Sequence, residues 1–232
     1  MNEISDRLHV IRERISAAAA RCGRDSAAVD LLAVSKTFPV EAIREAFDAG
    51  QMKFGENKVQ EVMAKAPQLP NSVEWHLIGR LQSNKVRKIL PLARFIHSVG
   101  SLDLARDVDR IAGELGLFPK IYLEVNLAAE SSKHGFSAEG LRASLEELYA
   151  LRRPEIQGLM CIPPYDEDPE KSRPYFVKLR ELRDELEQTG GAPLPLLSMG
   201  MSHDFEIAIE EGATIVRVGS AIFGERTYVK TS

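Results

Sequence analysis

The clearest structural signal in the chain is Leu31-Leu32-Ala33-Val34-Ser35-Lys36-Thr37. This apolar, β-prone run lacks polar alternation, which is typical of a parallel strand covered on both faces. Lys36 is then expected at the carboxyl end of a buried strand, where α/β proteins place their chemistry. Desolvation lowers the pKa of a lysine and leaves an amine that attacks aldehydes. Lys36 is therefore the leading candidate for a Schiff-base residue. The alternative is a lysine whose ammonium simply reaches solvent.

Short apolar runs and amphipathic helical patterns alternate from this stretch almost to the end of the chain. Strands are expected at residues 31–36, 52–55, 75–79, 94–99, 120–126, 156–162, 194–198 and 214–219. Helices are expected at residues 40–49, 58–65, 84–90, 102–115, 138–151, 169–188 and 204–211. Such alternation predicts right-handed βαβ units and a parallel sheet. Eight units in about 200 residues favour a closed (β/α)₈ TIM barrel. The second and fourth strands are short, and without either one an open doubly wound sheet is the alternative.

An additional N-terminal helix precedes this repeat. Its apolar residues follow helical spacing until Gly23 ends the pattern: Ile4, Leu8, Ile11 and Ile15. No Pro/Gly/Ser-rich linker or break in composition interrupts residues 31–225. We therefore expect one domain over residues 1–232, with the leading helix and a linker at 1–30 and the barrel at 31–226.

Composition and charge exclude several classes of protein. The chain of 232 residues is 44% hydrophobic and 28% charged, which is ordinary for a globular domain. A net charge of -4, with basic and acidic residues interleaved, argues against a nucleic-acid partner. Cys22 and Cys161 form no disulfide or zinc motif, and the charges within residues 1–21 exclude a signal peptide or membrane span. We expect a cytoplasmic protein that has no membrane partner and acts as a monomer.

The loops after the last two strands combine glycine with serine. In a (β/α)₈ barrel these two loops frequently bind phosphate. Gly200 and Gly219 would allow close backbone approach to an anion, while Ser202 and Ser220 supply hydroxyl donors. Helices starting just after them would add N–H groups. Glycine also serves simple strand-to-helix turns, but the joint location of the two pairs favours a phosphate site.

Arg217 is expected to point into the barrel, because alternation along residues 214–219 puts Val216 and Val218 on the opposite face. A buried arginine needs an acceptor, which is either a ligand atom or a carboxylate such as Glu124.

Other polar residues within or next to the strands have ordinary structural explanations. His76 and His97 are best interpreted as hydrogen-bonded core histidines rather than metal ligands. Asn57, at a strand end, has the alternative role of capping the next helix.

Short motifs follow one another from about residue 31 to 226: Val34-Ser35-Lys36-Thr37, Phe54-Gly55-Glu56-Asn57, Trp75-His76-Leu77-Ile78-Gly79, Ser198-Met199-Gly200-Met201-Ser202 and Arg217-Val218-Gly219-Ser220. In these segments the chain resembles the pyridoxal phosphate homeostasis protein family, also called the proline synthase co-transcribed homologues. The resemblance implies a barrel like the N-terminal domain of alanine racemase, with pyridoxal 5'-phosphate (PLP) in a Schiff base at Lys36. It also implies phosphate contacts from Ser202, Gly219 and Ser220, an Arg217 that faces the pyridine nitrogen, and an Asn57 beside the cofactor.

The expected function is that of a carrier which takes part in intracellular PLP homeostasis and has no catalytic residues. Arginine does not readily give up its proton, so a pyridine nitrogen facing Arg217 stays unprotonated and PLP is a weak electron sink. The barrel uses the whole chain, which leaves no second domain to supply an opposite base. Apo PLP-dependent enzymes are the expected protein partners.

Two enzymatic alternatives stay open. A PLP-dependent amino-acid racemase would need an acid–base group from Tyr165 in the loop at residues 163–169, or from a second chain. A class I aldolase acting on a sugar phosphate would also combine a Schiff-base lysine with a barrel phosphate site. Lys133 is the reserve amine if Lys36 is not the attachment point.

Overall fold

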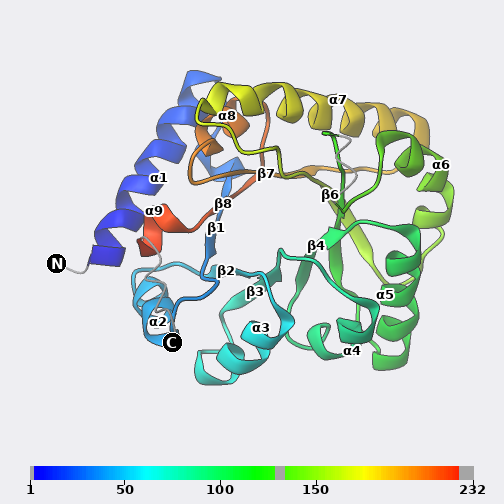
Figure 1. Ribbon diagram of the computed structural model, residues 1–232, viewed down its shortest axis with the longest axis horizontal. Helices are drawn as coiled ribbons and strands as arrows, with labels where there is room; N and C mark the ends of the chain where they lie inside the picture. The colour runs from blue at the N-terminus through cyan, green and yellow to red at the C-terminus, as the bar shows by residue number, and fades with distance from the viewer. Residues whose placement is uncertain (1–2, 129–133, 225–232) are drawn as a thin grey trace, which may run out of the picture.

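The computed structural model describes residues 3–128 and 134–224, and it shows a closed barrel of eight parallel strands in chain order (Figure 1). The strands are β1 Asp30–Val34, β2 Lys53–Glu56, β3 Glu74–Leu77, β4 Phe95–Val99, β5 Lys120–Glu124, β6 Glu155–Met160, β7 Leu196–Met201 and β8 Ile215–Val218. β1 pairs with both β2 and β8, which closes the circuit. The predicted (β/α)₈ barrel is confirmed. Because β2 and β4 both form, the open-sheet alternative is wrong.

Helices surround the barrel (Figure 1). They are α1 Glu3–Arg21, α2 Val40–Asp48, α3 Val59–Lys65, α4 Val86–Ile89, α5 Leu102–Leu115, α6 Ala138–Tyr149, α7 Arg173–Gly190, α8 Phe205–Glu210 and α9 Ser220–Phe223. Short 3₁₀ turns accompany them within the described residues: η1 Ser26–Ala28, η2 Ala66–Gln68, η3 Ser83–Lys85 and η4 Pro169–Ser172. The predicted N-terminal helix is present as α1. Over the residues described, no helix has both the length and the apolar character needed to cross a membrane.

The apolar core has two parts because barrel strands alternate between an inner and an outer face. Val216 and Val218 of β8 belong to the large cluster between strands and helices. Ile215 belongs to a separate inner cluster with Leu32 and Tyr122. Arg217 lies on the same inner side of β8 and is only 4% exposed. The predicted alternation along β8 is therefore confirmed.

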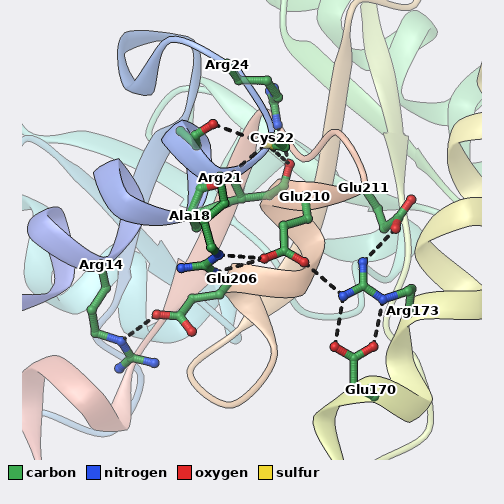
Figure 2. A network of polar contacts seen from close by, with 12 residues as sticks. Arg14, Ala18, Arg21, Cys22, Arg24, Glu170, Arg173, Glu206, Glu210 and Glu211 are labelled. Atoms are coloured by element: carbon green, nitrogen blue, oxygen red, sulfur yellow. Dashed lines mark hydrogen bonds and ion pairs between the residues drawn. The ribbon is translucent and has the colours of Figure 1, made fainter.

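Helix α1 packs against α8 and α9, the helices that follow the last two strands (Figure 1). Figure 2 shows the polar part of this contact, in which Arg14 pairs with Glu206 at 3.0 Å and Arg21 with Glu210 at 2.9 Å. Arg173 of α7 reaches Glu210 from the other side at 2.8 Å. Partly exposed pairs of this kind contribute about 0–1 kcal/mol each. Together they link α8, the helix that follows β7, to α1 on one side and to α7 on the other.

Candidate functional site

A cavity of about 590 Å³ brings together residues from several strand ends. Its lining includes all six residues proposed from the sequence: Lys36, Asn57, Ser202, Arg217, Gly219 and Ser220. Val34, Ile78 and Val125 add apolar wall. Cofactor pockets of this size combine mostly apolar walls with a few convergent polar groups. The structure thus places the predicted residues together, while their individual roles stay predictions.

Lys36 lies in a turn rather than on the strand itself. β1 ends at Val34, two residues before the predicted end. Ser35 still donates its N–H to Gly55 O at 3.1 Å, and Phe38 N–H then donates to Ser35 O at 3.1 Å, which closes a β-turn. Lys36 occupies the second position of this turn, is partly buried and lines the cavity. Lys36 therefore lies at the mouth of the barrel, as predicted, but the predicted end of β1 was wrong.

Arg217 is anchored by neutral groups. Its NH1 donates to Ser198 Oγ at 2.7 Å and its NH2 to the Cys161 carbonyl at 2.9 Å. The predicted structural partner, Glu124, accepts neither bond, so that assignment was wrong. Burial lowers the pKa of Arg217, and Glu124 is among the groups whose attraction opposes this shift. The described residues accept hydrogens from two of its three guanidinium nitrogens.

A chain of hydrogen bonds runs from Arg217 through the barrel interior to β3. Ser198 Oγ lies 2.8 Å from His97 Nδ1, His97 Nε2 lies 2.8 Å from His76 Nδ1, and His76 Nε2 lies 3.1 Å from Glu74 Oε1. The pKa of Glu74 is lowered, so its ionised carboxylate only accepts and His76 donates to it from Nε2. In neutral rings Nδ1 is then the acceptor in both histidines, and Ser198 donates to His97. Burial lowers the pKa of both rings and keeps them neutral. The prediction of hydrogen-bonded core histidines is confirmed.

The two Gly-Ser loops are joined to each other. Gly219 N–H donates to Ser202 Oγ at 3.1 Å, so this amide already has a partner within the protein. The hydroxyl hydrogen of Ser202 is left to donate elsewhere. At Gly200, φ is +89° and a Cβ would lie 2.6 Å from Ala208 Cβ of α8, so only glycine fits. A Cβ on Gly219 would approach Val34 O to 3.1 Å.

Asn57 lines the cavity but does not cap the next helix. The N-cap of α3 is Lys58, and no side chain caps this helix. The capping alternative is therefore wrong. Tyr165, in the loop between β6 and η4, also lines the cavity, is 80% exposed and contacts the His203 ring at a centroid distance of 5.7 Å. Lys133, the reserve amine, lies outside the described residues.

Sequence reasoning missed two residues that support the site. Ser198 was quoted only as part of a motif, although it links Arg217 to the histidines. Asp204 is buried and accepts a hydrogen bond from Met201 N at 2.7 Å, which shapes the Ser202 loop. An aspartate just before a helix was the available signal for Asp204. Nothing local distinguishes Ser198, because its partners lie on other strands.

Glu124, another lining residue, is expected to make the stability of the protein depend on pH. Burial raises its pKa from 4.5 to about 7, with Arg217 opposing the shift. The folded state thus holds this proton more tightly than the unfolded chain, and stability is lost as pH rises from about 4.5 to 7. We expect Glu124→Gln to gain roughly 2 kcal/mol relative to wild type between pH 5 and pH 8, as measured by urea unfolding. Exposed Glu146→Gln is the control, and parallel wild-type and Glu124→Gln profiles would refute this assignment.

Comparison with known proteins places the chain in a family. Residues 7–227 match the family described as alanine racemase, N-terminal domain. The pyridoxal phosphate homeostasis protein of Aquifex aeolicus (strain VF5) is 47% identical over 224 residues, covering 96% of this chain and 98% of the relative. PipY of Synechococcus elongatus PCC7942, solved with PLP bound, aligns with a TM-score of 0.85 at 43% identity, covering 95% of this chain and 100% of PipY.

A more distant structure shows the fold alone. Alanine racemase of Clostridium difficile 630 aligns with a TM-score of 0.75 at 14% identity, covering 99% of this chain and 58% of the racemase. The resemblance seen in the sequence motifs is confirmed by the full-length matches. The chain therefore belongs to the alanine racemase N-terminal domain family and, within it, to the pyridoxal phosphate homeostasis proteins.

Proposed function

We propose that this protein binds PLP in the cavity at the mouth of the barrel and takes part in intracellular PLP homeostasis as a non-catalytic carrier. The observation that carries the proposal is the meeting of Lys36, Arg217 and the two Gly-Ser loops in one cavity. The relative PipY, whose structure was solved with PLP bound, supports the choice of ligand.

The residues of the cavity fit PLP. Lys36 would hold the aldehyde end, Ser202 and Ser220 the phosphate, and Arg217 the pyridine nitrogen, with Asn57 beside the ring. When bound, PLP supplies an aldehyde that a lysine amine holds covalently. The donor set has the right chemistry, since an amine, a guanidinium and two hydroxyls line a space of about 590 Å³. A Cβ at Gly219 would crowd Val34, so glycine allows the start of the β8 loop to lie close to the end of β1.

The residues that line the cavity favour a carrier function over a racemase activity. Arg217 donates hydrogen bonds and keeps its own proton, so it leaves a ring nitrogen that faces it without one. Acid–base catalysis also needs a second group held within hydrogen-bond reach of the reacting carbon. Tyr165, the named candidate, is 80% exposed and has one ring contact, to His203, among the described residues. This placement argues against Tyr165 as a positioned base.

We further propose that the protein works in the cytoplasm, as a monomer that exchanges PLP with apo PLP-dependent enzymes. Cys22 and Cys161 are both free thiols, which agrees with a reducing compartment. Burial raises the pKa of Cys161 to about 12, so this thiol beside Arg217 is unreactive toward an aldehyde.

Isotope exchange separates a carrier from a racemase. With PLP-loaded protein in deuterated buffer, we expect deuterium to enter the α-position of L- and D-alanine within about tenfold of the rate with free PLP. The reason is that Tyr165, the candidate second acid–base group among the described residues, is exposed and not held in place. The same protein is expected to restore activity to an apo PLP-dependent enzyme. Exchange thousands of times above free PLP would establish catalysis instead, because positioned acid–base groups contribute about 10² to 10⁴.

A further inference from the structure

Behind the Lys36 turn lies a buried ionic cluster that does not line the cavity. Lys65 of α3 is 8% exposed and donates to three acceptors: Ser35 O at 3.0 Å, Glu56 Oε1 at 2.7 Å and Glu61 Oε2 at 3.2 Å. Lysine is almost never buried without such partners. Lys65, Glu56 and Glu61 are called the ionic clamp below.

The ionic clamp holds both neighbours of Lys36. On one side, Ser35 Oγ donates to Glu56 Oε1 at 2.7 Å, and the Ser35 carbonyl accepts from the lysine of the clamp. On the other side, Thr37 N–H donates to Glu61 Oε2 at 2.8 Å. Lys36 therefore lies between two residues that are tied to the same buried charges.

Thr37 shows why the turn needs this support. Its φ is +70°, and among the described residues it is the one non-glycine with positive φ. A β-branched residue in this region is strained, and such strain persists only where surrounding contacts outweigh it. The third position of a turn of this kind normally requires glycine or asparagine. The hydrogen bond from Thr37 N–H to Glu61 Oε2 offsets this strain.

The electrostatics identify Glu61 as the charged anchor of the turn. Burial acts to raise its pKa, but the Thr37 amide and the contacts with Glu56 and Lys65 outweigh burial and leave the pKa below its ordinary value. Glu56 differs, because burial raises its pKa to about 7 and its Oε2 has no hydrogen-bond partner among the described residues. Glu61 thus stays ionised at neutral pH and keeps accepting from Thr37.

We propose that the ionic clamp positions Lys36 for capture of an aldehyde, with Glu61 and Lys65 as positioning residues that hold the turn from outside the cavity. The proposal rests on the proposed function, because it assigns the PLP aldehyde to Lys36. A purely structural cluster would affect folding stability. A positioning cluster affects the rate at which the amine reacts, while phosphate-end binding is unchanged.

The test measures capture and binding separately. Capture is the rate of borohydride-trapped PLP adduct, and binding is the affinity for 4'-deoxypyridoxine 5'-phosphate, which has no aldehyde. We expect Glu61→Ala and Lys65→Met to slow capture by about tenfold to a hundredfold, since a misplacement of about 1 Å has effects of this size. Analogue affinity is expected to stay within about twofold of wild type. Gln60→Ala, an exposed change on the same helix, is the control and is expected to match wild type.

A second substitution tests the strain directly. Glycine adopts positive φ without a steric penalty, so Thr37→Gly is expected to return the capture rate of Glu61→Ala to within about threefold of wild type. Failure of this rescue, or unchanged capture in Glu61→Ala, would overturn the proposal. A parallel loss of capture and analogue affinity would also overturn it, because that pattern indicates general disruption.

The outcomes separate the two proposals. If wild-type protein neither captures PLP nor binds the analogue, the proposed function fails independently of the clamp. If Lys65→Met does not fold, Glu61→Ala with its glycine rescue still decides the matter, because the Glu61 side chain is 19% exposed and tolerates truncation better.

Discussion

Lys36→Ala abolishes covalent attachment of PLP and leaves the barrel folded. This result is expected because the substitution removes the amine that follows β1 and lines the cavity, while the side chain lies in a turn outside the apolar core. Wild-type protein is expected to be yellow when loaded with PLP. The measurement is the near-visible absorbance before and after borohydride reduction, followed by the mass of the modified peptide. Circular dichroism and thermal unfolding report whether the variant is folded.

Lys58→Ala is the matched control, because Lys58 is exposed and does not line the cavity. An unchanged spectrum in Lys36→Ala would move the attachment to another lysine, and Lys133 would be examined first. A colourless wild-type protein that instead forms a borohydride adduct with a sugar phosphate would favour the aldolase alternative.

Ser202→Ala combined with Ser220→Ala weakens PLP binding far more than pyridoxal binding. A hydroxyl that donates to a charged acceptor contributes about 1.5 to 3 kcal/mol, less what water recovers. For the pair this corresponds to roughly a hundredfold loss of PLP affinity, measured by fluorescence titration. Pyridoxal lacks the phosphate and is expected to change by less than about threefold.

The single variants refine this expectation, because Ser202 also accepts from Gly219 N–H. Ser202→Ala leaves that amide without its partner, so its effect includes a change in loop structure that Ser220→Ala lacks. Ser144→Ala on α6, away from the cavity, is the control. Equal losses for PLP and pyridoxal would show that these loops do not hold the phosphate.

Sequence patterns alone were enough to predict the architecture and a group of residues that line one cavity. Buried parallel strands need continuous apolar runs and their covering helices need a 3.6-residue period, and both patterns can be read locally. Even the weak runs that became β2 and β4 were predicted, because the alternation of strands and helices around them favoured a strand at each place. Alternation along β8 placed Arg217 inside the barrel. The carboxyl ends of parallel strands meet at one edge, which explains why residues from Lys36 to Ser220 line one cavity.

The contacts that hold these residues depend on how the strands and helices pack. The partners of Arg217 come from β7 and from the residue after β6, and no local pattern chooses Ser198 over Glu124. The end of β1 depends on where its pairing with β2 stops, and the last bond there runs from Ser35 N–H to the Gly55 carbonyl. No local pattern therefore predicted the turn at Lys36.

The ionic clamp illustrates the same limit most directly. Glu61 lies 24 residues after Thr37, and Lys65 lies 30 after Ser35. Periodicity indicates which face of a helix is buried, but not which backbone group a buried charge will meet. Hydrogen bonds and ion pairs are short-ranged and directional, so their partners are settled only when the strands and helices have packed.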